Sequence, residues 1–224
     1  MRLVTLPGVF RPISDSRMLA EALRRETLPP GARVLDLCTG SGILALTAAL
    51  RGVRDVTAVD VSRRALLTVR LNARLNGVRI RTLRGSLFEP VTGEQFDAIV
   101  SNPPYVPAAA EDLPRHGPRR AWEAGTDGRV LLDRILAEAP RHLRPGGRLL
   151  VVHSSILGFE PTGRALEDAG LTVGVAGRAR GPLGPLMTAN RELLEARGML
   201  RPGQAEEEVQ VIRARRPGAV PARV

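Results

Sequence analysis

The sequence predicts an α/β fold in which a single doubly wound domain is built on a seven-stranded, mostly parallel sheet. Two observations carry this prediction. Short apolar runs alternate with longer runs of helical periodicity, as they do where crossover helices join parallel strands. Glycine and proline residues separate these runs, and a chain of 224 residues is long enough to form one domain with a full hydrophobic core.

Strands are expected at apolar runs of strand length, which in order are residues 33–38, 55–61, 78–83, 96–101, 148–153, 171–176 and 208–214. Helices are expected where apolar residues recur at helical spacing, at residues 14–26, 43–51, 62–75, 128–143, 163–169 and 188–197. Asn76-Gly77 ends the third helix, because both residues tolerate the left-handed backbone of a helix C-terminus. Proline and glycine predict loops over residues 103–118 and 178–186.

These elements place one domain over residues 1–214, with a helical lead-in over 1–30 and a flexible basic tail over 215–224. No apolar run approaches the roughly 20 residues that span a bilayer, and the N-terminus does not read as a signal peptide. Cys38 is the single cysteine, which excludes an internal disulfide and suits a reducing compartment, so a cytoplasmic protein is expected. The three histidines are dispersed, and no metal site is expected.

The formal net charge is +10, and all 33 basic residues are arginine. Two interpretations stay open. The arginines are either the solvated surface of a protein from a GC-rich genome, or part of a surface for nucleic acid. Seven of them fall between Arg63 and Arg84, either as a basic patch or as one wet helix face.

A glycine turn follows the first expected strand, in the sequence Val34-Leu35-Asp36-Leu37-Cys38-Thr39-Gly40-Ser41-Gly42. Gly40 and Gly42 let the backbone approach a ligand, and the next helix presents unpaired N–H groups there. Asp60 ends the second strand, where a carboxylate can accept hydrogen bonds from the hydroxyls of a ribose. This arrangement predicts an adenosine-containing cofactor.

The cofactor class is less clear from the turn alone. Gly40-x-Gly42-x-x-Ala45 also fits a dinucleotide fingerprint, which would make the chain a nicotinamide-dependent oxidoreductase. Asp36 argues against that rival, because a carboxylate just before the turn repels a pyrophosphate. The same carboxylate could hold the amino group of a methionine moiety, or it could simply cap the loop.

Asn102-Pro103-Pro104-Tyr105 follows the fourth strand, at the sheet edge where open α/β folds bind ligands. The two prolines stiffen the loop and remove two backbone donors, which leaves the Asn102 side-chain oxygen and the Pro103 carbonyl as acceptors. Such a pair suits the –NH2 group of a carboxamide or a nucleobase, and Tyr105 could stack on a flat substrate. The simpler alternative is a proline-rich turn capped by Asn102.

With these motifs in place, the chain resembles the HemK-type class I methyltransferases, whose members methylate glutamine in peptide-chain release factors. The likeness covers most of residues 9–213. Its matching pieces are Phe10-Arg11-Pro12, Asp15-Ser16, Leu35 to Gly42, Val59-Asp60, Gly85-Ser86-Leu87-Phe88, Asn102 to Tyr105 and Gly125-Thr126-Asp127-Gly128.

The resemblance implies a Rossmann-like fold with an antiparallel last strand, S-adenosylmethionine as cofactor, and a protein substrate. It leaves open whether a small activating subunit is needed. It implies that Asn102, Pro103, Pro104 and Tyr105 receive the substrate amide and form the catalytic loop. The cofactor residues that we expect are Asp36, Cys38, Thr39, Gly40, Ser41, Gly42, Asp60, Val61, Ser86, Leu87 and Asn102.

The chain departs from the family pattern at three points. Cys38 stands where glycine is usual, and the turn is expected to accept it at a negative φ. Ser86 replaces a common aspartate, so adenine recognition is expected to depend on Leu87 and backbone groups. The sequence also lacks the helical N-terminal domain of the bacterial release-factor enzymes, and it is more similar to the compact eukaryotic and archaeal branch.

The sequence therefore predicts an N-methyltransferase that acts on a protein glutamine amide. One alternative is a nucleic-acid methyltransferase that acts on an exocyclic adenine or guanine amine, which needs a flipped base and stronger phosphate contacts. An alternative of another class is a non-catalytic module that binds nucleotides.

Overall fold

A computed structural model describes residues 1–218 of the chain. One seven-stranded sheet runs through it in the order β3-β2-β1-β4-β5-β7-β6. The strands are β1 (Arg33–Leu37), β2 (Asp55–Asp60), β3 (Arg81–Arg84), β4 (Phe96–Ser101), β5 (Leu143–Ser154), β6 (Thr172–Pro182) and β7 (Glu206–Arg215). The five strands from β1 to β5 pair in parallel, and β7 lies antiparallel between β5 and β6. The expected sheet, with its antiparallel last strand, is confirmed.

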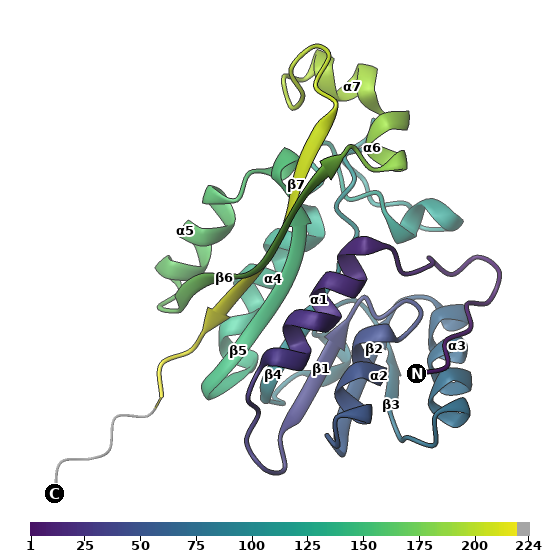
Figure 1. Cartoon of the computed structure of the whole chain (residues 1–224), viewed down its shortest axis with the longest axis vertical. Coiled ribbons are helices and arrows are strands. Elements are labelled where there is room, and N and C mark those ends of the chain that lie inside the picture. Colours follow the sequence, from purple (N-terminus) through teal and green to yellow (C-terminus); the bar gives the residue numbers. More distant parts are fainter. Residues whose placement is uncertain (219–224) are drawn as a thin grey trace, which may run out of the picture.

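Helices cover both faces of this sheet (Figure 1). They are α1 (Ser14–Arg25), α2 (Ile43–Leu50), α3 (Arg63–Leu75), α4 (Val130–His142), α5 (Glu160–Asp168), α6 (Pro185–Ala189) and α7 (Arg191–Ala196). On one face, α1, α2 and α3 bury residues such as Leu19 and Val69 against the strands, and on the other face α4 and α5 bury Ile135 and Leu166. Within the described residues, no helix is long and apolar enough to cross a membrane.

The prediction was wrong where tertiary pairing extends a strand. Residues 178–182, expected in a loop, continue β6 because each of them pairs with β7. Pro182 is tolerated there because β6 is an edge strand and Pro182 is its last residue. The expected helix over 188–197 is two short helices, separated at Asn190.

The last strand ends one residue later than expected. Arg215, assigned to the tail, pairs with Arg148 of β5 and Thr172 of β6, so it belongs to the sheet. Arg216 still donates its backbone N–H to the Gly147 carbonyl at 2.9 Å. Residues 219–224 lie outside the described residues, and the flexible tail predicted there stays a prediction.

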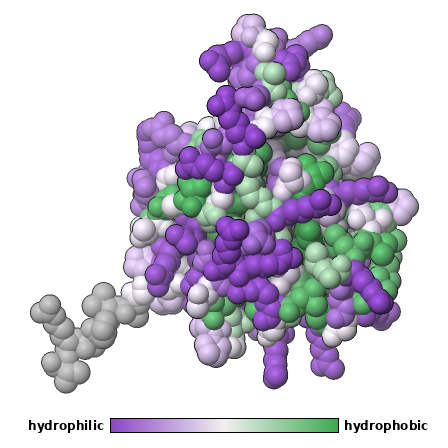
Figure 2. All heavy atoms as spheres, in the orientation of Figure 1, coloured by the Kyte–Doolittle hydropathy of each residue, from purple (hydrophilic) through white to green (hydrophobic). Residues whose placement is uncertain are grey.

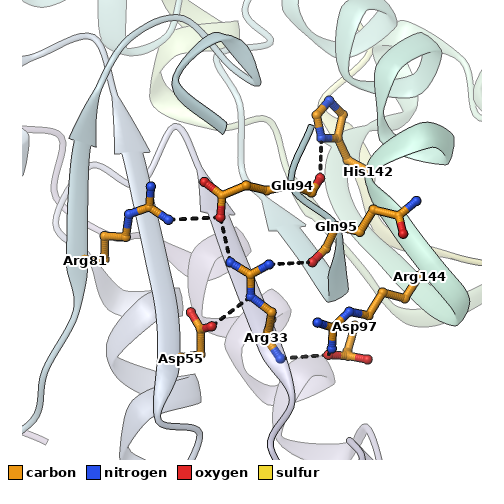
Figure 3. A network of polar contacts seen from close by, with 8 residues as sticks. All are labelled: Arg33, Asp55, Arg81, Glu94, Gln95, Asp97, His142 and Arg144. Carbon is orange, nitrogen blue, oxygen red and sulfur yellow. Dashed lines mark hydrogen bonds and ion pairs between the residues drawn. The ribbon is translucent and has the colours of Figure 1, made fainter. Parts of the chain in front are cut away.

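A polar network ties together the amino ends of the parallel strands (Figure 3). Arg33 begins β1, and its guanidinium contacts Asp55 of β2 at 2.8 Å and Glu94 at 2.6 Å. Glu94 also pairs with Arg81, the first residue of β3, at 2.9 Å. Asp97 of β4 accepts a hydrogen bond from the Arg33 backbone N–H at 2.8 Å. Arg33 thus links β1 to β2 and β4 directly, and to β3 through Glu94, at the end of the sheet remote from the glycine turn.

Asn72 of α3 and Asn76, which caps the C-terminal end of that helix, hold the N-terminal segment in place. The buried Asn72 amide exchanges two hydrogen bonds with the backbone of Val4, each 2.8 Å long. Asn76, one turn later, does the same with Arg2 at 2.8 and 2.6 Å. Asn72 also donates to the carbonyl of Ser41 at 3.0 Å. The N-terminal segment and the glycine turn therefore share one buried anchor.

Candidate cofactor and substrate site

A cavity of about 360 Å³ opens at the carboxyl ends of β1, β2 and β4. That is the size and the sheet edge expected for a small-molecule site in an open α/β fold. Ten of the expected site residues line it: Cys38, Thr39, Gly40, Ser41, Asp60, Val61, Ser86, Leu87, Asn102 and Pro104. The expected residues Asp36, Gly42, Pro103 and Tyr105 are not among the lining residues.

The glycine turn is built from left-handed residues. Gly40 has φ +52° and Gly42 has φ +82°, and a Cβ at Gly42 would lie 2.9 Å from Cγ2 of Val69 in α3. Gly42 therefore supports the cofactor turn by letting α3 approach it. Cys38 was expected at a negative φ, and this expectation is wrong, because its φ is +55°. The path of the turn requires a left-handed backbone at residue 38, although a residue with a side chain disfavours that conformation.

A second strained residue lies across the cavity. Leu87 has φ +48°, and it and Cys38 are the two non-glycine residues with positive φ in the described chain. Both line the cavity. Strain of this kind costs about 1–3 kcal/mol per residue and gathers at ligand sites. Neither conformation carries a sequence signal, because leucine and cysteine ordinarily avoid this region.

Asp60 joins the end of β2 to the turn. Its Oδ2 accepts from the Gly40 N–H at 3.0 Å and its Oδ1 from the Ser62 N–H at 2.8 Å. Burial raises the pKa of this carboxyl, while these backbone donors and the charge of Arg120 act to lower it. Each oxygen keeps acceptor capacity, and Asp60 lines the cavity. The carboxylate therefore shapes the turn and still faces the ligand space, as a ribose-binding acid must.

Asp36 is completely buried beneath the turn. Its Oδ2 accepts from the Thr39 hydroxyl at 2.6 Å and from the Ala45 N–H at 3.0 Å, whereas its Oδ1 has no partner among the described residues. Burial raises the pKa of Asp36 to about 7. Of the two roles considered for Asp36, these contacts are those of a loop cap. A role toward the methionine moiety stays a prediction.

We expect Asp36→Asn to stabilise the cofactor-free protein at pH 8 and not at pH 4. The unfolded carboxyl ionises near pH 3.8 and the folded one only near pH 7, so the wild-type free energy of unfolding falls as the pH rises between these values. The full difference corresponds to roughly 4 kcal/mol, and an unpaired buried amide offsets about 1–3 kcal/mol of it. Urea unfolding at both pH values measures the change, and a gain independent of pH would contradict the assigned pKa.

The Asn-Pro-Pro-Tyr loop is held at both ends by the first turn of α1. The Asn102 side-chain N–H donates to the Ser16 hydroxyl at 2.9 Å, and the Tyr105 hydroxyl donates to Asp15. Tyr105 is therefore anchored beside the cavity wall, and stacking on a substrate stays a prediction. Gly128 packs against the same loop, since a Cβ there would lie 2.5 Å from the Tyr105 carbonyl oxygen.

The sequence did not identify the two segments that flank the cavity opening. Gly8, Val9, Phe10 and Pro12 line one side, and residues between Leu113 and Glu123 line the other. The rings of Phe10 and Trp122 meet at 6.4 Å between centroids, so the two segments touch. The match of Phe10-Arg11-Pro12 to the family pattern pointed to the first segment, but it does not say where in the fold that segment lies.

Comparison with known proteins finds methyltransferases. Residues 1–114 match the family model described as methyltransferase small domain. A putative protein N5-glutamine methyltransferase of Methanocaldococcus jannaschii is 33% identical over 184 residues, which cover 82% of this chain and 91% of that protein. The release factor glutamine methyltransferase of Geobacter sulfurreducens is 39% identical, over 66% of this chain and 54% of that protein. The chain thus spans nearly all of the archaeal relative and about half of the bacterial one.

A solved structure adds a similar fold. The 16S rRNA N2 G1207 methyltransferase of T. thermophilus, in complex with AdoMet and guanosine, superposes with a TM-score of 0.61 at 25% identity. The match covers 95% of this chain and 46% of that one.

Proposed function

We propose, from the premise that this chain belongs to the methyltransferase small domain family and to its HemK-type branch, that it methylates the side-chain amide of a protein glutamine. The chain is an S-adenosylmethionine-dependent methyltransferase. The identity of the acceptor is the part that we propose. A peptide-chain release factor is the protein substrate that we favour, in keeping with the relatives.

The cavity has the features that S-adenosylmethionine requires. Gly40 lines the cavity without a side chain where a ligand must approach, and the Asp60 carboxylate faces the same space. Ser86 and Leu87 form a further part of the wall, where we place the adenine. Asp36 lies one layer below and fixes the turn through Thr39 and Ala45. When bound, the cofactor supplies an electrophilic methyl group.

One observation carries the proposed acceptor. Asn102 lines the cavity with its side-chain N–H donated to Ser16, and no described residue donates to its Oδ1. The free oxygen is the acceptor needed to hold an –NH2 group, whose lone pair is otherwise delocalised into the planar amide. Holding this nitrogen in place and polarising it lowers the barrier without a strongly basic residue.

Labelling with tritiated S-adenosylmethionine in cell extract tests the acceptor class. We expect label in macromolecules that is removed by protease and survives nuclease, and label on a recombinant release factor when that protein is supplied alone. Label that survives protease and disappears with nuclease would overturn the glutamine proposal in favour of a nucleic-acid amine.

The nucleic-acid alternative depends on the arginines between Arg63 and Arg84. The structure gives three of them local partners: Arg70 bonds Thr82 at 2.7 Å, Arg81 pairs with Glu94, and Arg84 donates to the Val61 carbonyl at 3.3 Å. Exposed leucines at 67, 71 and 75 separate the arginines of α3 that have no such partner among the described residues. Figure 2 shows apolar side chains mixed with hydrophilic ones over the side of the molecule where α2 and α3 lie. This mixture favours a solvent-exposed helix face over a continuous surface that binds phosphates.

The remaining expectations about context belong to the same proposal. The single cysteine supports a reducing compartment, and we propose the cytoplasm. A small activating subunit stays a prediction, to be tested by whether the purified chain alone transfers methyl groups. The non-catalytic alternative is not retained, because the family consists of enzymes.

A further inference from the structure

The Asn-Pro-Pro-Tyr loop is stiff between its ends, but its own sequence does not fix how the Asn102 amide is turned. A primary amide presents either its oxygen or its nitrogen, which differ by a half-turn of the side-chain torsion. Only the oxygen can accept from a substrate –NH2 group. Some other residue must therefore hold the Asn102 side chain in place, and Ser16 is in contact with it.

Ser16 makes that contact from the first turn of α1. Its hydroxyl oxygen lies 2.9 Å from the Asn102 Nδ2, Ser16 is buried, and it lines the same cavity. With the nitrogen bonded to Ser16, the Asn102 Oδ1 is left without a protein donor among the described residues. The hydroxyl can donate as well as accept, so the contact fixes where the Asn102 side chain lies, and this bond leaves the Asn102 Oδ1 for the substrate.

Asp15 secures the other end of the loop. One oxygen of its carboxylate accepts from the Ser14 hydroxyl at 2.8 Å and the other from the Tyr105 hydroxyl. Burial, followed by the nearby Asp15 charge, raises the pKa of Tyr105 well above its usual value, so the phenol keeps the proton that it donates. The Tyr105 hydroxyl therefore remains a donor to Asp15 at neutral pH.

The helix that carries both residues is rigidly placed. Leu19 and Leu23 of α1 are fully buried in the core that α1 shares with the sheet. At the other end of α1, Glu26 pairs with Arg148 of β5 at 2.6 Å. Because α1 is fixed along its length by the sheet, its first turn can hold the loop in a defined position.

We infer that Asp15 and Ser16 form a clamp in which Ser16 is a positioning residue that holds the Asn102 side chain at the cavity wall, while Asp15 fixes Tyr105 at the far end of the loop. The inference rests on the proposed function, because the position of the Asn102 side chain matters to catalysis only if Asn102 receives an –NH2 group. It adds a task that the glycine turn and the loop sequence do not assign to any residue.

The test compares Ser16→Ala with Ser16→Thr, which retains the hydroxyl. Methyl transfer from S-adenosylmethionine to a recombinant release factor should fall about 10- to 100-fold in kcat for Ser16→Ala and should be largely restored in Ser16→Thr. The Kd for S-adenosylmethionine, measured by calorimetry, should stay within about twofold in both variants, since the cofactor residues are unchanged. Adding Ser16→Ala to Asn102→Ala should cause no further loss.

Nuclear magnetic resonance provides a readout that does not need activity. The Asn102 side-chain N–H signals, identified by their disappearance in Asn102→Ala, should exchange slowly in the wild type and Ser16→Thr and rapidly in Ser16→Ala. A Ser16→Ala variant with wild-type kcat, or an equal loss in the presence and absence of Asn102, would overturn the clamp. If the wild type does not label the release factor while the signals behave as expected, the proposed function fails and the Ser16 contact stands.

Discussion

Asn102→Ala should lower kcat for methyl transfer by about 10²–10³-fold. Losses of this size follow when one preorganised hydrogen-bonding group that stabilises the charge of the transition state is removed. The acceptor nitrogen loses the oxygen that holds it, and its lone pair stays delocalised in the amide. Binding of S-adenosylmethionine should change far less, because the turn, Asp60 and Leu87 keep their positions. Single-turnover transfer and calorimetric titration separate the two quantities.

Asn102→Asp is the matched comparison for this experiment. It keeps an acceptor toward the substrate but removes the donor to Ser16, so it should recover part of the rate lost in Asn102→Ala. An alanine variant that turns over at the wild-type rate would remove Asn102 from the reaction and leave the loop with a structural role only.

Asp60→Ala should weaken the binding of S-adenosylmethionine by roughly 1–3 kcal/mol, about 5- to 150-fold in Kd. Two effects add in the same direction. The ribose hydroxyls lose a charged acceptor, and the Gly40 N–H that Asp60 holds at 3.0 Å is released, which loosens the turn. Equilibrium titration of the purified protein with the cofactor measures the change in Kd.

A loss of stability must be distinguished from a loss of ligand contacts in this variant. Arg33→Ala supplies the control, because it removes the strand-end network at the other end of β1 and should lower the Tm while leaving the cofactor Kd unchanged. If Asp60→Ala bound the cofactor as tightly as the wild type, the assignment of Asp60 to the ribose would be wrong.

Much of this site was predictable because its residues are contiguous or follow a strand directly. The glycine turn, Asp60 and Asn102 each stand at the end of a parallel strand, and such ends meet at one edge. The sheet could be predicted for the same reason, since buried parallel strands read as short apolar runs. The strand over residues 178–182 was not predicted, because it depends on pairing with β7 and not on the composition of these residues.

The unpredicted features depend on contacts between distant residues. Ser16 and Asn102 are separated by 86 positions, and their hydrogen bond follows from how α1 packs on the sheet. The left-handed Cys38 and Leu87 likewise follow from what surrounds them, because local preference opposes both conformations. The cavity opening near Phe10 and Trp122 also depends on a contact between segments that are far apart in the sequence.

The strand-end network around Arg33 also bears on how this protein can be engineered. It lies at the amino ends of β1 to β4, whereas the groups assigned to cofactor and acceptor lie at or beyond the carboxyl ends of the strands. The five residues of β1 alone separate the two ends of the sheet by roughly 13 Å. Heat resistance can therefore be improved, or the protein immobilised on a support, through the amino edge without reshaping the cavity.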